Sequence, residues 1–157
     1  MLKYGTILFT LLMFQWCCTQ VPLDSLDGIM KREPRYILMN IRSKNCVYCL
    51  MQMKRLNKDK DLMRQLNENV YFVEWELEAQ PDFSFGGRLF SKNKSAGRYP
   101  GEKFIDVYLQ EVKGEIGYPL WFVFDKNYNF IYHYFGLLPN KSIMEMVEVL
   151  LRQENEK

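Results

Sequence analysis

The sequence predicts a single α/β domain, and three observations lead to that prediction. The chain has 157 residues, of which 48% are apolar and 15% aromatic, enough for one substantial core. Short β-prone apolar runs alternate with longer segments whose apolar residues recur every three or four positions. No internal repeat or low-complexity stretch interrupts this alternation. We therefore expect a helix, a strand, a helix, a strand, a loop-rich insertion, a helix, two strands and a final helix.

The first twenty residues differ from the rest and have the pattern of a secretory signal. A single cation, Lys3, precedes the mostly apolar run 6–16. This run is well short of the ~20 residues that a helix needs to cross about 30 Å of hydrocarbon, so we expect export and removal of residues 1–20. The domain would then span residues 21–157. The alternative is a lipoprotein signal in which Cys17 or Cys18 is the acylated first residue, giving a lipid anchor.

The first half of the domain is predicted from apolar spacing and from helix and turn signals. The predicted elements are a helix over residues 23–32, a strand over 35–41, a helix over 47–66 disturbed at 57–61, and a strand over 70–77. Leu50 and Met53 begin the apolar stripe of the long helix. The two cysteines Cys46 and Cys49 therefore lie where a strand gives way to a helix.

The second half begins with an insertion that is rich in Gly, Pro and cations. The predicted elements are an insertion over residues 79–101 with a small hairpin around Gly86-Gly87, a helix over 102–112, strands over 120–124 and 129–135 joined by a turn, and a final helix that starts at Asn140 as its N-cap. The charges balance closely, with 21 Lys and Arg against 19 Asp and Glu. This balance favours neither nucleic acid nor an anionic membrane as a partner.

The cysteine count narrows the chemistry once the signal is set aside. Only Cys46 and Cys49 then remain, as one C-x-x-C. A secreted domain held by disulfides would carry several separated cysteines, so this pair is not a stability framework. A closed zinc site needs four ligands, and besides the pair the domain offers only His133, without a second C-x-x-C. We expect no metal and no organic cofactor.

The spacing of the pair at a helix start favours thiol–disulfide exchange. Two intervening residues let the sulfurs meet across one turn, and the unpaired N–H groups of that turn favour a thiolate on the first cysteine. Cys46 would attack a substrate disulfide, and Cys49, deeper in the helix, would resolve the mixed disulfide. The alternative is a pair of inert core cysteines, which have no reason to prefer a strand-to-helix junction.

Four sequence segments together resemble the thioredoxin superfamily, in particular the exported thioredoxin-like domains of the bacterial cell envelope. They are ILMN at 37–40, CVYC at 46–49, YPLWFVFD at 118–125 and Gly136 before the last helix. The likeness covers about residues 23–153. It implies a three-layer α/β/α fold with a central mixed sheet and an insertion before a cis-proline.

The resemblance also implies which residues meet a substrate. The proline Pro119 would be cis and lie beside the cysteines, so that the backbone of Tyr118 can pair with a substrate strand. Tyr118 and Leu120 are candidate substrate contacts, with packing as the alternative role for both. Val47 and Tyr48, between the cysteines, complete the predicted substrate-binding set.

Three departures from typical thioredoxins affect what the resemblance implies. Asn45 replaces the usual Trp, and Val47-Tyr48 replaces Gly-Pro, so the redox potential does not transfer. Asn40 stands where thioredoxins place a buried Asp, and an amide cannot exchange a proton at neutral pH. Either water or a carboxylate such as Glu74 or Glu76 moves the proton for Cys49 instead, or attack by Cys49 is slow. Both glutamates are otherwise expected to be strand residues facing solvent. His133, among aromatics on a strand, is expected to be structural.

The sequence therefore predicts an exported, monomeric thiol–disulfide oxidoreductase of the cell envelope. It would act on protein thiols or disulfides, more as a reductant than as an oxidant, and a redox partner would recharge its dithiol. A rival reading is a redox-inactive thioredoxin-fold module that binds a protein or peptide. A second rival is a Cu(I) chaperone using the thiolates of Cys46 and Cys49.

Overall fold

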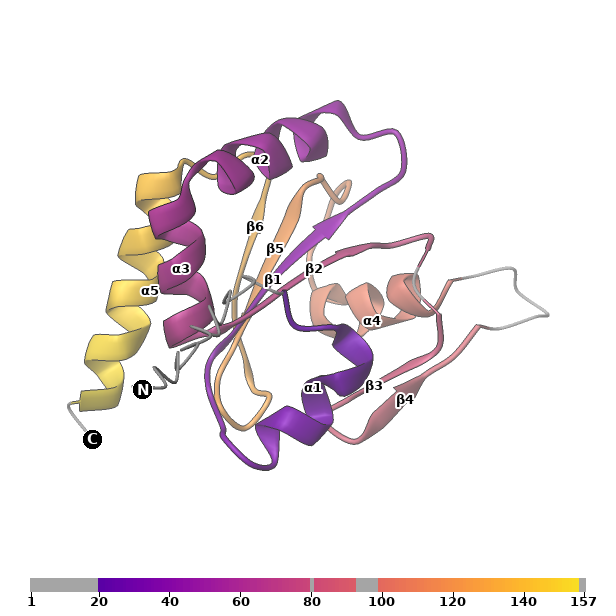
Figure 1. The fold of residues 1–157 in the computed structure, drawn as a ribbon. Helices are drawn as coiled ribbons and strands as arrows, with labels where there is room; N and C mark the ends of the chain where they lie inside the picture. The colour runs from indigo at the N-terminus through magenta and orange to yellow at the C-terminus, as the bar shows by residue number, and fades with distance from the viewer. Residues whose placement is uncertain (1–19, 80, 93–98, 156–157) are drawn as a thin grey trace, which may run out of the picture.

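The structure is a computed structural model that describes residues 20–79, 81–92 and 99–155. The predicted signal, with Cys17 and Cys18, lies outside the described residues apart from Gln20. The described chain forms three layers, in which a central sheet lies between two groups of helices (Figure 1). A separate two-stranded hairpin lies beside the helices of one layer.

The elements follow the predicted order, with the long predicted helix divided in two. The helices are α1 (Leu23–Met30), α2 (Val47–Lys58), α3 (Lys60–Asn69), α4 (Pro100–Leu109) and α5 (Asn140–Asn155). The strands are β1 (Ile37–Arg42), β2 (Tyr71–Glu76), β3 (Phe83–Phe85), β4 (Arg88–Phe90), β5 (Leu120–Phe124) and β6 (Phe130–Phe135). The break between α2 and α3 at Asp59 confirms the disturbance predicted at 57–61.

The central sheet is mixed and has the strand order β2-β1-β5-β6. Strands β1 and β2 are parallel, and α2 and α3 form the crossover between them. Strand β5 runs antiparallel to both β1 and β6. The turn between β5 and β6 is closed by the Asp125 carboxylate, which accepts hydrogen bonds from the N–H groups of Asn127 and Asn129. The predicted fold class, a mixed sheet between two helical layers, is confirmed.

Each face of the sheet buries its own core, because successive side chains of a strand point to opposite faces. One core is aromatic and lies under α1, α4 and the β3–β4 hairpin; in it the ring of Phe104 packs against those of Trp75 and Phe85. The other core is mostly aliphatic and is covered by α2, α3 and α5, with Leu66 and Val147 among its members. The two cores fix the sheet between its layers.

The cysteines and the β5–β6 turn lie at opposite ends of the sheet. At one end Ile41 pairs with Leu120, and Cys46 follows that end of β1. The turn after Phe124 lies at the other end. The predicted hairpin in the insertion is confirmed as β3–β4, and its turn residue Gly86 lies against the Tyr128 ring. The turn of the hairpin is therefore on the side of the sheet away from the cysteines.

Two helix starts differ from the sequence prediction. Helix α4 begins at Pro100 because the Glu102 carboxylate accepts a hydrogen bond of 2.8 Å from the Tyr99 N–H, which places Glu102 inside the first turn. Asn140 was predicted as an N-cap, and this is wrong. Its Oδ1 is buried with no hydrogen-bond partner among the described residues, and its Nδ2 donates to Asp59, whose other oxygen caps α3.

Candidate active site around the cysteine pair

Cys46 and Cys49 form a disulfide across the first turn of α2, with their Cα atoms 5.2 Å apart. Cys46 is the residue just before the helix, and its Sγ accepts a hydrogen bond of 3.1 Å from the Cys49 N–H. Its side chain is half-buried, whereas Cys49 is only 3% exposed. An incoming sulfur can therefore reach Cys46, while Cys49 stays behind it.

The position of Cys46 gives its sulfur the electrostatics of a helix N-terminus. The first N–H groups of a helix have no partner within the helix and carry partial positive charge. The hydrogen bond from the Cys49 N–H already uses one of these donors on the Cys46 sulfur. After reduction, the same donors would stabilise a thiolate at Cys46.

A tight turn carries the chain from β1 into the cysteines. The Cys46 N–H donates to the Ser43 carbonyl at 3.3 Å, and Asn45 adopts a left-handed conformation with φ of 61°. Asn is one of the few residues besides Gly that tolerates this conformation. Lys44 and Asn45 are exposed. The Glu78 carboxylate accepts hydrogen bonds from Ser43 and Lys44, a contact that no local pattern in the sequence indicates.

The peptide bond between Tyr118 and Pro119 is cis, which confirms the expectation drawn from the resemblance. The Pro119 carbonyl accepts a hydrogen bond of 2.8 Å from the Gly136 N–H, so this segment and the end of β6 are held together. A shallow apolar groove of about 320 Å³ lies here. Its lining residues are Tyr48, Gly117, Tyr118, Phe135, Gly136 and Leu137. Since Tyr48 lies between the cysteines, the groove opens beside the disulfide.

The predicted substrate-binding residues differ in how accessible they are. Val47 and Tyr48 are 66% and 61% exposed, and Tyr118 is half-buried at the groove. Pro119 and Leu120 are buried, and Leu120 is 0% exposed. The expectation that Leu120 contacts substrate is therefore wrong, because its side chain belongs to the aromatic core.

The exposed apolar surface continues past the cysteines along α2. Leu50 and Met51 are 52% and 40% exposed, so Leu50 does not lie on the buried stripe where its spacing had placed it. The buried face of α2 instead consists of Cys49, Gln52 and Leu56. Sequence reasoning missed Gln52 because it is polar, yet it is 0% exposed.

The Tyr118 hydroxyl is held in its neutral form. Burial, together with the negative charges of Glu78, Glu102 and Asp106, raises the pKa of Tyr118 to about 12. At neutral pH this phenol is therefore protonated. It can act at the groove as a hydrogen-bond donor and acceptor, and not as a base.

Asn40 and Glu74 are neighbours in the parallel pair of strands β1 and β2, on the face covered by α2. Asn40 is 1% exposed, and its Nδ2 has no hydrogen-bond partner among the residues described. The Glu74 side chain is 7% exposed, so the expectation that it faces solvent is wrong. Burial raises its pKa, although a hydrogen bond from Gln20 and the charge of Arg42 oppose that rise. Glu76 stays more accessible, with its side chain 28% exposed.

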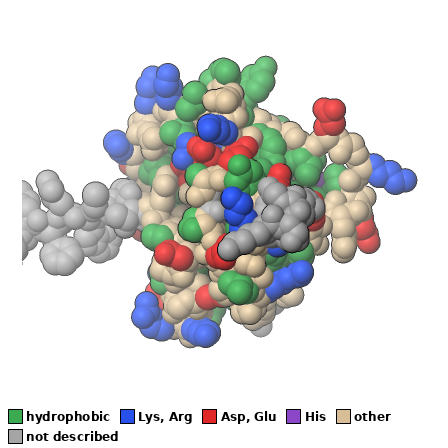
Figure 2. All heavy atoms as spheres, turned by 90° about the vertical axis from the view of Figure 1, so that its right-hand side faces the viewer, with side chains coloured by type: hydrophobic (Ala, Val, Ile, Leu, Met, Phe, Trp, Pro, Cys, Tyr) green, Lys and Arg blue, Asp and Glu red, His purple; other side chains and the backbone are tan. Residues whose placement is uncertain are grey.

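The remaining candidates lie apart from this chemistry. His133 stacks on the Phe130 ring, in keeping with the structural role expected of it. In the described ranges, no group of three or more His, Cys, Asp or Glu side chains could hold a metal ion. On the face drawn in Figure 2, cationic and anionic side chains are interspersed and form no patch of one sign.

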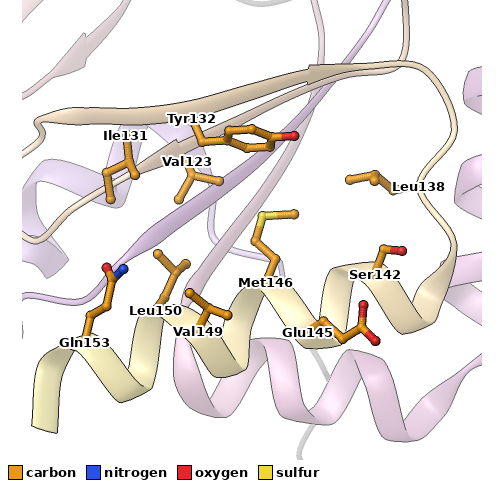
Figure 3. A pocket seen from close by; sticks show the side chains of 10 residues that line it. All are labelled: Val123, Ile131, Tyr132, Leu138, Ser142, Glu145, Met146, Val149, Leu150 and Gln153. Carbon is orange, nitrogen blue, oxygen red and sulfur yellow. The ribbon is translucent and has the colours of Figure 1, made fainter.

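A second hollow, of about 390 Å³, lies between β5, β6 and α5 (Figure 3). Met146 and Leu150 point from α5 toward the sheet. The residues that line the hollow include Ile131, Tyr132 and Val149, but none of the cysteines or groove residues. This hollow is therefore separate from the redox site.

Comparison with known proteins identifies solved structures with a similar fold. Neither a protein-family model nor a curated protein sequence matches the chain. Solved structures do match. A thioredoxin-fold protein from Helicobacter pylori is 19% identical with a TM-score of 0.55, and the match covers 73% of this chain and 68% of that one.

Two further solved structures are similar over more of the chain. A thioredoxin from Thermus thermophilus is 13% identical with a TM-score of 0.56, over 83% of this chain and 84% of that one. The C-terminal domain of Neisseria meningitidis DsbD in its oxidised form is 12% identical with a TM-score of 0.54, over 80% and 90%. Together with the mixed sheet, the cis-proline and the disulfide at the start of α2, these matches show that this protein has the thioredoxin fold.

Proposed function

We propose that this protein is a thiol–disulfide oxidoreductase that exchanges disulfides with protein substrates through Cys46 and Cys49. The observation that carries the proposal is the placement of Cys46. Its accessible sulfur lies at the N-terminus of α2, beside an apolar groove, and is bonded to a cysteine that is itself buried. Inert core cysteines would need neither the helix terminus nor the groove.

The reaction uses one cysteine for attack and the other for release. In the reduced protein the Cys46 thiolate attacks one sulfur of a substrate disulfide; the substrate S–S bond breaks, and its other sulfur leaves as a thiolate. Cys49 then loses its proton and attacks the Cys46 Sγ. This step forms the Cys46–Cys49 disulfide and releases the second substrate thiolate. Two electrons pass from the protein to the substrate.

A polypeptide substrate fits the surface around Cys46. Val47, Tyr48, Leu50 and Met51 form an exposed apolar surface that would bury apolar area against a partner. The groove beside the cis-proline gives an extended segment a place to lie, with the backbone of Tyr118 available for pairing. We assign Val47, Tyr48 and Tyr118 to substrate binding on this basis. Pro119 is itself buried, and we assign it to the same site because its cis bond sets the backbone of Tyr118 at the groove.

Further parts of the proposal concern location and the direction of electron flow. We propose an exported, monomeric envelope reductase of residues 21–157, with a lipid anchor at Cys17 or Cys18 as the alternative to full signal removal. A reductant of this kind needs a redox partner that returns electrons to the dithiol. Among the residues the structure describes, no helix is long and apolar enough to cross a membrane.

The proposal is tested by the redox equilibrium of the pair. The protein is equilibrated in graded glutathione buffers, and free Cys46 and Cys49 are quantified by alkylation beside a Cys46→Ser control. We expect a reversible two-electron transition with a midpoint below roughly −220 mV. A midpoint above roughly −150 mV would reverse the assigned direction. If no transition appears, the protein is not an oxidoreductase. The alternative is then a redox-inactive binding module, which predicts that a partner of the wild-type protein also binds Cys46→Ser.

A further inference from the structure

Glu78 lies two residues beyond β2, where the parallel pairing of β1 and β2 continues past the strands. The Leu77 N–H donates to the Arg42 carbonyl at 2.8 Å, which extends the ladder by one bond. This bond brings Glu78 alongside the segment that follows Arg42 and leads into Cys46. The Glu78 carboxylate therefore reaches Ser43 in this turn, although the two residues are 35 positions apart in sequence.

Both oxygens of Glu78 bind consecutive residues of that turn. The Ser43 hydroxyl donates to Oε1 at 2.6 Å, and the Lys44 N–H donates to Oε2 at 2.9 Å. Ser43 in turn accepts the Cys46 N–H through its carbonyl, and Asn45 between them is left-handed. One carboxylate therefore fixes the first half of a turn whose second half ends at Cys46.

The carboxylate is ionised when it does this. Burial alone would raise the pKa of Glu78, but the hydrogen bonds from Ser43 and Lys44, together with the charge of Lys44, bring it below its ordinary value. The same negative charge contributes to the raised pKa of Tyr118. Glu78 thus acts electrostatically on the residue before the cis-proline while it holds the turn before the cysteines.

We propose that Glu78 is a positioning residue that holds the Cys46 sulfur at the N-terminus of α2 for attack; this inference rests on the proposed thiol–disulfide exchange. In the oxidised protein the bond to Cys49 itself fixes Cys46. Reduction breaks that bond, and the position of the sulfur then depends on the turn before Cys46 and on the hydrogen bond from the Cys49 N–H. The hydrogen bonds to Glu78 matter most in the reduced, nucleophilic form.

The test measures the reactivity of Cys46 in the purified, reduced protein with glutathione disulfide as the probe. The second-order rate constant is followed from pH 5 to 9. Its midpoint reports the thiolate pKa, and its plateau reports reactivity once the thiolate is fully formed. Glu78→Ala should lower the plateau by roughly tenfold, the effect of losing a charge-assisted hydrogen bond. Glu78→Gln, which keeps an acceptor oxygen, should lower it by roughly threefold.

Matched variants separate positioning from general damage. Ser43→Ala removes one of the two donors and should lower the plateau by roughly threefold, without adding to the effect of Glu78→Ala in the double variant. Glu148→Ala, an exposed glutamate on α5, should leave the plateau unchanged. If Glu78→Ala does not fold, as judged by its urea transition, Ser43→Ala and Glu78→Gln carry the test.

Two outcomes overturn different claims. If the Glu78 and Ser43 variants share the wild-type plateau, Glu78 does not position Cys46, although the exchange activity stands. If the wild-type protein fails to react with glutathione disulfide at any pH, the proposed function itself fails.

Discussion

The Tyr128 hydroxyl donates a hydrogen bond of 2.7 Å to Oδ1 of Asp27, across 101 residues of sequence. The same carboxylate accepts hydrogen bonds from the Ser84 hydroxyl and from the N–H groups of Gly86 and Gly87. Asp27 therefore joins α1, the turn of the β3–β4 hairpin and the β5–β6 turn at the end of the sheet away from the cysteines. Three segments that share no backbone pairing meet at one side chain.

Replacing Asp27 should destabilise the fold in a pH-dependent way. Burial raises the pKa of Asp27, but the hydrogen bonds from Ser84, Tyr128, Gly87 and Gly86 together hold it below its ordinary value. A lowered folded-state pKa means that the stabilisation is present above the unfolded pKa and is lost as pH falls through the folded one. We expect Asp27→Ala to lose about 2–3 kcal/mol at pH 7, measured by urea unfolding.

The pH series supplies the check on this assignment. The difference in the free energy of unfolding between wild type and Asp27→Ala should become smaller as the pH falls below about 4, where the carboxyl becomes protonated. Asp24→Ala, in the exposed first turn of the same helix, is the control and should change stability little. A gap that stays constant with pH would mean that the charge of Asp27 plays no part.

Gly101→Ala should destabilise the protein even though alanine is the better helix former. An added Cβ at Gly101 would lie 2.7 Å from Trp75 Cζ3 and 2.7 Å from Leu77 Cδ1, closer than atoms can approach. Helix propensity favours alanine by about 1 kcal/mol, whereas overpacking costs about 1–3 kcal/mol, and the buried Trp75 ring has little room to move. We expect a net loss in thermal unfolding, with Gly28→Ala, where the space is open, as the control. A stabilised Gly101→Ala would show that Trp75 can shift.

Gln52→Leu should cost about 2–4 kcal/mol although it makes α2 more apolar. The Gln52 side chain donates to the Leu138 carbonyl at 3.1 Å and accepts from the Leu138 N–H at 2.9 Å. Leucine would leave both buried backbone groups without partners. The matched control is Gln110→Leu, at an exposed position, and equilibrium urea unfolding compares the two. If Gln52→Leu is as stable as Gln110→Leu, the hydrogen bonds of Gln52 do not stabilise the contact between α2 and the segment before α5.

Glu74→Gln should stabilise the protein at neutral pH. Burial raises the folded-state pKa of Glu74, so ionisation destabilises the fold as pH rises through the interval between its unfolded and folded values. The amide removes that penalty, so the variant should be the more stable form at pH 7 and match wild type well below pH 4. Glu76→Gln, whose side chain is more exposed and pairs with Arg42 at 3.6 Å, should show no gain. A less stable Glu74→Gln would mean that its attraction to Arg42 outweighs burial.

Local patterns predicted the elements but not the contacts between distant ones. Gly86 and Gly87 predicted the hairpin because its turn needs positive φ values, and they have φ of 60° and 78°. The cis bond before Pro119 came from the resemblance, since nothing local requires it. Apolar spacing placed Leu50 inward, but the backbone of Leu138 needs a polar partner, so the helix turns Gln52 inward instead.

Charged residues were the hardest to place from sequence. A strand glutamate is ordinarily solvated, but Glu74 is buried, and its partners there, Gln20 and Arg42, are both remote in sequence. The sequence does not indicate the contacts of Glu78, because its partners Ser43 and Lys44 lie in the connection that follows a different strand. Such pairings follow from the sheet register, which a single sequence does not reveal.

The two described tryptophans give each face of the sheet its own optical signal. Trp75 lies in the aromatic core, and Trp121, on the opposite face, donates its indole N–H to the Gly136 carbonyl at 3.2 Å. Gly136 also lines the groove beside the cysteines. Indole emission depends on hydrogen bonding and polarity. In a chain of residues 21–157 that carries Trp75→Phe, Trp121 is the remaining tryptophan, and its fluorescence would respond to events in that groove. Substrate docking and turnover could then be followed in real time without an added dye.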